Sequence, residues 1–321
     1  MVMTSFDLTG RRVWVAGHRG MAGSAIVRRL MRENCETVTA TRSELDLLRQ
    51  ADVEAWMADR KIDVVFLAAA TVGGIMANAT RPAEFLYNNI AIEANVIHAA
   101  WRTNIKKLLF LGSSCIYPRM AQQPMREEAL LTGALEPTNE WYAIAKIAGI
   151  KLCQAFRRQY GCDFVSVMPT NLYGPGDRYD VEGGHVVAAL IMKIHAAKTT
   201  NSQTVELWGS GTPKREFLYS EDLADACIFV VKNYSNEMSL NVGTGLDMTI
   251  LELAQTIAKI IDWEGIFTFD RSKPDGTLRK VMDVSRLRAL GWTAPTNFEA
   301  GMKEAYQWYL SNLVGSTSLS G

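Results

Sequence analysis

The sequence lacks several features that would mark other classes of protein. No apolar run approaches the ~20 residues that a helix needs to cross a bilayer, and the N-terminal stretch 1–12 lacks the apolar core of a secretory signal. Basic and acidic side chains number 34 each, so the formal net charge is zero and gives no sign of a surface for polyanions. We expect a cytoplasmic protein that has neither a membrane nor a nucleic-acid partner.

Cysteine and histidine are scarce, and neither follows a pattern typical of metal ligands. The chain has five cysteines without a CxxC pair and four histidines without metal-ligand spacing. The cysteines are Cys35, Cys115, Cys153, Cys162 and Cys227. An odd number of scattered cysteines is typical of reduced thiols in a cytoplasm. We expect no disulfide framework and no metal site.

The first half of the chain alternates regularly between strand-like and helical segments. Apolar, β-rich runs are followed by stretches with helical periodicity. The predicted strands are 12–16, 37–41, 64–70, 107–112 and 163–168, and the predicted helices are 24–33, 82–101 and 142–160. This alternation predicts an α/β fold with a doubly wound parallel sheet that is buried on both faces.

The regular alternation of strand-like and helical segments ends after about residue 171, which predicts a second and smaller α/β domain. The helices expected in this part of the chain are 187–196, 220–231 with Ser220 as the cap, 249–261 and 298–313. A strand at 205–208 belongs to it, whereas a strand at 240–242 returns to the first domain, so the smaller domain is discontinuous. We place the first domain at 8–175 plus about 216–245, and the second at about 176–215 and 246–313. The polar end, 314–321, is expected to be disordered.

Three glycines stand between the first strand and the first helix. Gly17, Gly20 and Gly23 form G-x-x-G-x-x-G, in which the backbone can approach a pyrophosphate and the helix N-terminus offers unpaired N–H groups. The pattern therefore predicts a dinucleotide site. The alternative is a glycine-rich turn that lets the helix and strand pack.

The residue after the second strand indicates which dinucleotide binds. Enzymes that use NAD place Asp or Glu there, whereas the 2′-phosphate of NADP calls for a cation. This chain has Arg42, and Arg19 in the glycine loop adds a second guanidinium that can hold a phosphate with two hydrogen bonds. NADP(H) is favoured. The alternative is that Arg42 is a solvated loop residue paired with Glu44.

Two further groups suggest chemistry at the end of the strand 107–112. Ser113 and Cys115 follow the strand directly, either as turn residues or as groups that face a substrate. Tyr142 and Lys146 are four residues apart, so they share one face of a helix. A lysine one turn away can stabilise a phenolate, whose parent phenol has a reference pKa of ~10.

The glycine loop, the strand-end serine and Tyr-x-x-x-Lys together resemble the extended short-chain dehydrogenases/reductases. Longer blocks narrow the resemblance to the epimerase/reductases of nucleotide sugars in that family. These blocks are 17–26, 109–118, 136–153, 168–175, 208–219, 241–245 and 273–277. The resemblance implies a Rossmann-type fold and a homodimer that pairs the helices 82–101 and 142–160. It also implies NADPH-dependent conversion of GDP-4-keto-6-deoxy-D-mannose to GDP-L-fucose, by 3,5-epimerisation and then 4-keto reduction.

The resemblance also implies roles for individual residues. Ser113 and Tyr142 would hold the substrate ketone, with Tyr142 as proton donor and Lys146 as its support. Cys115 and His185 would be the acid and base of epimerisation, and which proton each handles stays open. Cofactor binding is implied for Gly17, Arg19, Gly20, Met21, Gly23, Arg42, Leu111, Lys146 and His185. Contacts with the GDP-sugar are implied for Lys193, Trp208, Arg215 and Asp275.

The sequence also fits other functions that share these motifs. A colitose-type enzyme shares the motifs but acts on a 3,6-dideoxy-4-keto sugar and inverts carbon 5 alone. Another NADP-dependent nucleotide-sugar epimerase, dehydratase or reductase would keep the fold. A non-catalytic NADP sensor belongs to a different class, and the presence of Ser113, Tyr142 and Lys146 argues against it. Cys115 by itself also fits a small buried apolar residue.

Overall fold

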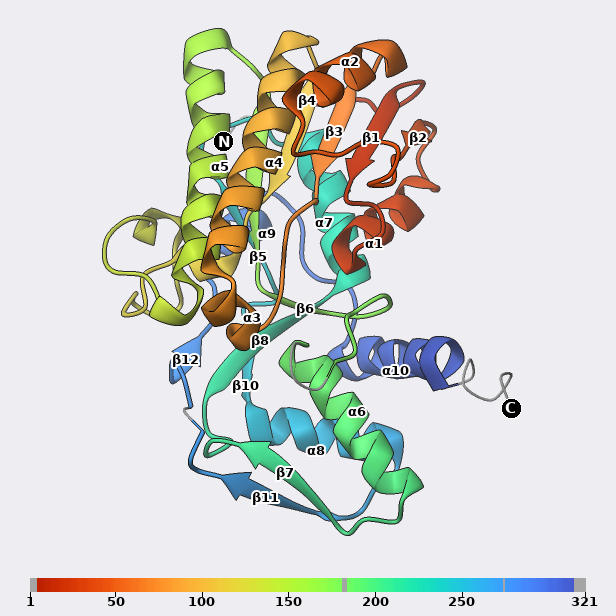
Figure 1. Cartoon of the computed structure of the whole chain (residues 1–321), viewed down its shortest axis with the longest axis vertical. Coiled ribbons are helices and arrows are strands. Elements are labelled where there is room, and N and C mark those ends of the chain that lie inside the picture. The colour runs from red at the N-terminus through yellow and green to blue at the C-terminus, as the bar shows by residue number, and fades with distance from the viewer. Residues whose placement is uncertain (1–4, 181–183, 274, 315–321) are drawn as a thin grey trace.

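A six-stranded parallel sheet organises the larger part of the molecule in the computed structural model (Figure 1). The structure describes residues 5–180, 184–273 and 275–314. The strand order is β2-β1-β3-β4-β5-β9, and every neighbouring pair is parallel. The strands are β1 Arg12–Ala16, β2 Glu36–Val38, β3 Val64–Leu67, β4 Lys107–Leu111, β5 Phe164–Pro169 and β9 Leu240–Val242. The predicted doubly wound sheet, including the return of the strand 240–242, is confirmed.

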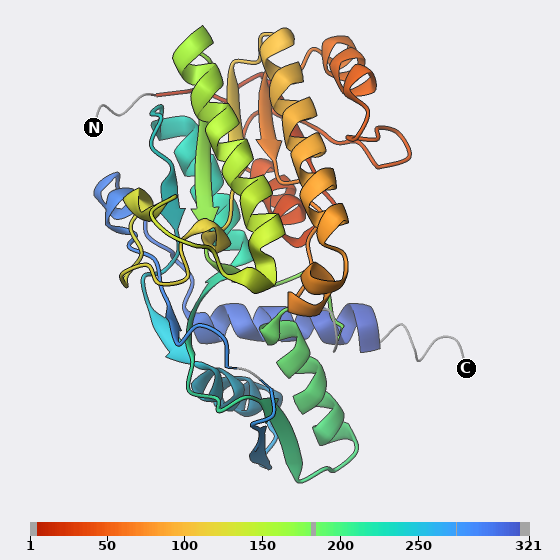
Figure 2. The same ribbon diagram turned by 60° about the vertical axis from the view of Figure 1, so that its left-hand side comes forward.

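Helices cover both faces of this sheet, which explains why its strands are apolar on both sides. Trp14 faces a core formed with α2, α4 and α5, whereas Val13 and Val15 face a core formed with α1, α7 and α9. The helices are α1 Met21–Leu30, α2 Gln50–Arg60, α4 Pro82–Arg102, α5 Glu140–Tyr160, α7 Ser220–Asn233 and α9 Ser285–Ala289. Figure 2 shows α4 and α5 side by side along the sheet.

Sequence analysis missed or misplaced several details of the larger part. It missed α2, α9 and the short α3 (Ile75–Thr80). In α2, Val53 and Met57 are its only fully buried residues, so the apolar periodicity is weak. The cap assigned to Ser220 was wrong. Tyr219 occupies the cap position, and the buried Ser220 hydroxyl has no hydrogen-bond partner among the described residues.

A smaller unit lies at one end of the large sheet (Figure 1). Its own core lies among α6, α8, α10 and short strands. The helices are α6 Val186–Thr199, α8 Ile250–Ile261 and α10 Phe298–Tyr309, followed by a π-helical turn, Leu310–Val314. The strands are β6 Asn171–Tyr173, β7 Thr204–Trp208, β8 Lys214–Tyr219, β10 Asp247–Thr249, β11 Ile266–Asp270 and β12 Arg279–Lys280. Sequence analysis found β7 alone, because strands of a few residues with charged members carry little periodic signal.

The exact division into domains stays a proposal. The strand β8 precedes α7 and pairs with β6, β10 and β12 in the smaller unit. The segment around α9 returns to the larger part, where Leu287, Leu290 and Trp292 join the core beneath α7. Of the chain end expected to be disordered, 314–321, residue Val314 belongs to the π-helical turn, and 315–321 lie outside the described residues. Among the helices of the described ranges, none combines the length and apolar character needed to cross a membrane.

Candidate active site

A cavity of about 640 Å³ opens at the carboxyl ends of β1, β3 and β4. Ligands of open α/β sheets bind at this edge because the strands end there and loops diverge. Every residue predicted to bind the cofactor lines this cavity. They are Gly17, Arg19, Gly20, Met21, Gly23, Arg42, Leu111, Lys146 and His185. Ser113 and Tyr142 line it as well. Their roles stay predictions, but the fold brings all of them to one place.

The glycine loop makes a close backbone contact that excludes side chains. Gly17 has φ +88°, and a Cβ there would lie 2.6 Å from the backbone of Ala69. A Cβ at Gly23 would lie 2.1 Å from the carbonyl oxygen of Gly17. Gly20 caps α1 without a side-chain hydrogen bond. The glycines therefore serve packing, as the alternative expects, and the same packing leaves the N-terminus of α1 facing the cavity.

Two guanidinium groups lie at the rim of the cavity. Arg19 and Arg42 are exposed, and neither forms an ion pair with any residue of the described ranges. Glu44 accepts hydrogen bonds from the backbone N–H and the hydroxyl of Thr41, at 2.7 and 2.8 Å. Both hydrogen bonds end on Oε2 of Glu44, and no ion pair between Glu44 and Arg42 is formed among the described residues. Both arginines remain available for a phosphate.

Lys146 and Tyr142 lie side by side on α5, at the wall of the cavity. The Lys146 Nζ donates to the carbonyl oxygen of Leu111 at 3.0 Å and lies 5.8 Å from the centre of the Tyr142 ring. Burial raises the pKa of the Tyr142 phenol well above its ordinary value, and the charges of Cys115 and Glu93 add to the rise. The phenol is therefore protonated at neutral pH, as a proton donor must be.

The turn after β4 explains the serine and thiol at the strand end. Ser113 caps a short 3-10 turn, and its Oγ accepts a hydrogen bond from the Cys115 backbone N–H at 3.3 Å. This turn leaves Ser113 on the cavity wall and folds Cys115 inward, where it is 7% exposed. Burial raises the pKa of the Cys115 thiol, and the nearby ammonium of Lys280 is the largest opposing influence. Sequence analysis missed Lys280, which β12 brings to Cys115 from far along the chain.

His185 stands immediately before α6, where its ring reaches the cavity. Its Nδ1 lies 3.4 Å from Oδ1 of the buried Asp177. The contact with Asp177 raises the pKa of His185, which favours the imidazolium near neutral pH. Sequence analysis gave Asp177 no role, because nothing in the loop pattern shows that it turns back to His185.

The residues expected to contact a GDP-sugar form a second cluster in the smaller unit. The Lys193 Nζ lies 5.3 Å from the centre of the Trp208 ring, and that ring is 51% exposed. Asp275 accepts a hydrogen bond from the backbone N–H of Ser210 at 2.6 Å. Arg215 lies opposite Lys280 in the β8–β12 pair, so this cluster is continuous with the surroundings of Cys115.

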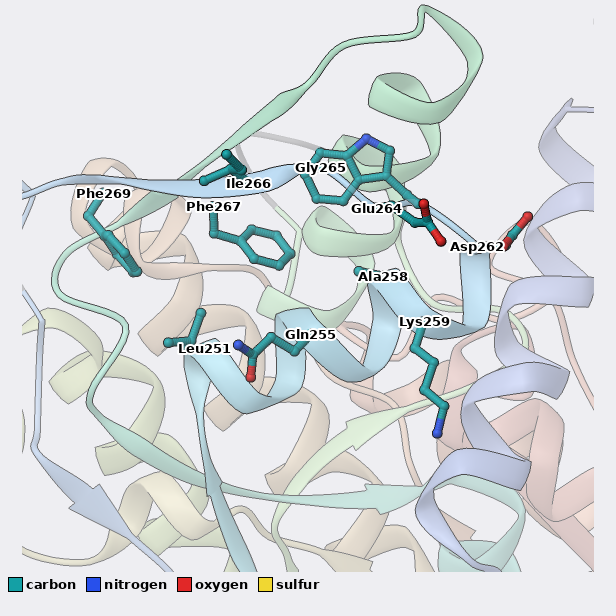
Figure 3. A pocket seen from close by; sticks show the side chains of 11 residues that line it. Leu251, Gln255, Ala258, Lys259, Asp262, Glu264, Gly265, Ile266, Phe267 and Phe269 are labelled. Atoms are coloured by element: carbon teal, nitrogen blue, oxygen red, sulfur yellow. The ribbon is translucent and has the colours of Figure 1, made fainter.

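Another cavity, of about 660 Å³, lies between α8 and β11 in the smaller unit (Figure 3). Its lining includes Leu251, Lys259 and Phe269. None of the predicted site residues lines it. Among the described residues, no group of three or more His, Cys, Asp and Glu side chains could hold a metal ion.

The parallel sheet, with a glycine loop and a cavity at the carboxyl ends of its strands, is that of an extended short-chain dehydrogenase/reductase. The chain belongs to the NAD dependent epimerase/dehydratase family, whose model matches residues 13–243.

Within this family the chain is similar to enzymes of GDP-sugar metabolism. It is 55% identical to the GDP-L-fucose synthase of Escherichia coli strain K12, over 95% of this chain and 98% of that protein. It is 38% identical to the GDP-L-colitose synthase of Yersinia pseudotuberculosis, over 94% and 98% of the two chains. The solved structure of a GDP-L-fucose synthetase from Naegleria fowleri bound to NADP matches with a TM-score of 0.88 and 28% identity. That match covers 96% of this chain and 97% of the Naegleria chain.

Proposed function

We propose that the chain converts GDP-4-keto-6-deoxy-D-mannose to GDP-L-fucose, by epimerisation at carbons 3 and 5 and NADPH-dependent reduction at carbon 4. One observation carries the proposal: the Ser113–Tyr142–Lys146 set lies beside a buried thiol, Cys115, and a carboxylate-paired imidazole, His185. A reductase alone needs the first set. The additional thiol and imidazole supply the acid and base that epimerisation requires. The identity to GDP-L-fucose synthases supports the same conclusion.

The cavity fits a nicotinamide dinucleotide. Gly17 and Gly23, where a Cβ would clash with backbone, keep the loop tight before and within the first turn of α1, at whose N-terminus a pyrophosphate would bind. Arg19 and Arg42 would hold the 2′-phosphate that distinguishes NADPH from NADH. Lys146 and His185 line the same cavity, together with Ser113 and Tyr142. When bound, NADPH supplies the hydride for carbon 4.

Epimerisation depends on acidic protons beside the ketone. Carbons 3 and 5 both flank the carbonyl, and donors on its oxygen stabilise the enolate that forms when a proton leaves. Ser113 and Tyr142 are placed to donate those hydrogen bonds. Cys115 and His185 then lift and return protons at the sugar ring. Burial raises the pKa of the Cys115 thiol, and the Lys280 ammonium opposes that rise, which eases the loss of the thiol proton.

Reduction follows once the ring has its new configuration. Tyr142 donates its phenolic proton to the carbonyl oxygen as hydride arrives at carbon 4. Lys146 supports the phenolate left behind, and Ser113 holds the oxygen in place.

Turnover in heavy water tests this function. NADPH oxidation with GDP-4-keto-6-deoxy-D-mannose should yield a product with deuterium at carbons 3 and 5, located by NMR. Deuterium at one carbon or neither would move the chain to a neighbouring reductase. A parallel assay with the 3-deoxy ketosugar separates the colitose-type reaction, because turnover of that sugar alone would exclude the proposed function.

Arg42→Ala should weaken NADPH binding and spare NADH. Loss of a charged hydrogen bond to the 2′-phosphate is expected to raise the Kd for NADPH about 10- to 100-fold. The Kd for NADH, which lacks that phosphate, should stay nearly the same. Fluorescence titration of both cofactors measures the two values. Arg32→Ala, at an exposed arginine outside the cavity, is the matched control. An equal loss for both cofactors would contradict the role of Arg42.

We also propose a homodimer that pairs α4 and α5 of two subunits. These helices pack together and still carry exposed apolar side chains, namely Tyr87, Ile90, Trp141 and Ile144. Burial of such a surface in a partner is favourable. Sedimentation equilibrium should give twice the mass of one chain, and the mass of one chain would exclude the dimer. A cytoplasmic location is proposed as well, because all five cysteines are free thiols.

A further inference from the structure

A buried carboxylate lies directly behind Lys146. Glu93, on α4, is 1% exposed, and its Oε1 lies 3.1 Å from the Lys146 Nζ on α5. The space for this carboxylate exists because residue 149 is glycine. A Cβ at Gly149 would lie 2.6 Å from the Glu93 Oε2 and 2.5 Å from the Phe110 ring. The packing of α4 on α5 is therefore built around the Glu93–Lys146 pair.

Stability alone is a poor explanation for this pair. Removing two charges from water costs several kcal/mol per ion, and apolar residues of similar size often stabilise a core equally well. Burial raises the pKa of Glu93, and the Lys146 ammonium opposes that rise. A buried acid whose partner is a cavity-lining lysine points to a function of that lysine.

The ammonium of Lys146 is held from two sides. Its Nζ donates a hydrogen bond to the carbonyl oxygen of Leu111, at the end of β4, and forms an ion pair with the Glu93 Oε1 at 3.1 Å. Lys146 also lines the cavity together with Tyr142. We propose that Glu93 is a positioning residue, which aims the Lys146 ammonium into the cavity and sets the charge beside the Tyr142 phenol. This inference rests on the proposed function, in which Lys146 and Tyr142 serve the reduction.

The sign of the electrostatic effect follows from the groups around the phenol. Cys115, beyond β4, and Glu93, on α4, both raise the pKa of Tyr142. Lys146 shares α5 with Tyr142, and Lys280 approaches Cys115 from β12. Cys153, also on α5, is a further titratable group near Glu93; burial raises the pKa of its thiol, and the charge of Glu93 adds to the rise. Glu93 therefore keeps Tyr142 protonated to higher pH and gives the Lys146 ammonium its counter-charge.

Glu93→Gln keeps the shape of the side chain and removes its charge. The phenol of Tyr142 should then lose its proton at lower pH, because Glu93 raises its pKa in the wild-type protein. This moves the basic limb of the pH profile of kcat to lower pH, by about one unit. We also expect kcat to fall about tenfold, part of what a general acid contributes. The Kd for NADPH should rise, because the Lys146 ammonium loses the ion pair that holds it at the wall of the cavity.

Two further variants separate positioning from mere packing. Glu93→Asp keeps the negative charge on a side chain that is one methylene shorter, so the carboxylate lies farther from Lys146. The basic limb of the pH profile of kcat should stay in place, while kcat itself falls severalfold. Asp163→Asn is the matched control, since it removes a carboxylate from another buried lysine, Lys107, at 2.9 Å and far from the cavity. It should lower the melting temperature and leave both the basic limb and the Kd for NADPH unchanged.

The inference is overturned if Glu93→Gln loses thermal stability as Asp163→Asn does but keeps the wild-type basic limb and NADPH affinity. Should Glu93→Gln fail to fold, Glu93→Asp decides, and a wild-type kcat in that variant would overturn the inference. Absence of turnover in the wild-type enzyme would count against the proposed function instead. NADPH affinity then still tests the role of Glu93, because binding can be measured without turnover. Weaker binding in Glu93→Gln with unchanged binding in Asp163→Asn would support the inference.

Discussion

Tyr142→Phe should nearly abolish NADPH-dependent reduction of the ketosugar. The substitution removes one hydroxyl and leaves the ring, whose edge contact with Phe85 at 6.5 Å between centroids keeps its place. Without the phenolic proton the ketone has no acid, so kcat should fall by a factor on the order of 10²–10⁴. Stopped-flow or steady-state absorbance of NADPH measures the loss.

NADPH binding should survive in the same variant. The glycine loop and the two rim arginines lie on other elements, so the Kd for NADPH is expected to remain close to that of the wild-type protein. Tyr160→Phe makes the same chemical change near the end of the same helix, at a half-exposed tyrosine, and should leave kcat unchanged. Wild-type turnover in Tyr142→Phe would remove the phenol from the mechanism.

Cys115→Ser should suppress exchange of the substrate protons with solvent. A hydroxyl has almost the size of a thiol but ionises far less readily, so the base or acid needed at the sugar ring is lost. The rate of deuterium incorporation at carbons 3 and 5 is expected to fall by about 10²–10⁴. NMR of the ketosugar in heavy water follows the exchange directly, and a cofactor titration shows that NADPH still binds.

A second buried cysteine provides a control that distinguishes a catalytic role of Cys115 from a packing role. Cys153, on α5, is as buried as Cys115, and burial raises the pKa of its thiol to about 12. Cys153→Ser should cost some stability and leave the exchange rate unchanged. Normal exchange in Cys115→Ser would make Cys115 a packing residue, which is the role that its burial by itself also fits.

Local patterns in the sequence predicted the larger sheet well. The strands β1, β3, β4 and β5 were identified because each is a short apolar run between turn signals, and neighbours along the chain define such a run. The errors fall where that signal is weak. The helix α2 buries little, and β8 begins with the charged residues Lys214, Arg215 and Glu216.

The sequence by itself determined the features that depend on residues a few positions apart. The glycine spacing 17-20-23, the Tyr142–Lys146 spacing and the serine at the end of β4 each fit within one turn or one strand end. These motifs lie close together because the carboxyl ends of parallel strands are at the same edge of the sheet. For these residues, local pattern and general fold rules were sufficient.

The tertiary structure alone decided which groups tune those residues. Glu93 reaches Lys146 from α4, Asp177 turns back to His185, and Lys280 reaches Cys115 from β12. No periodicity connects such partners, since each contact depends on how helices and strands distant in the sequence pack. The charge of a buried group depends on every neighbour within a few ångströms. The candidate reacting groups could therefore be proposed from the sequence, whereas their protonation and orientation are properties of the folded chain.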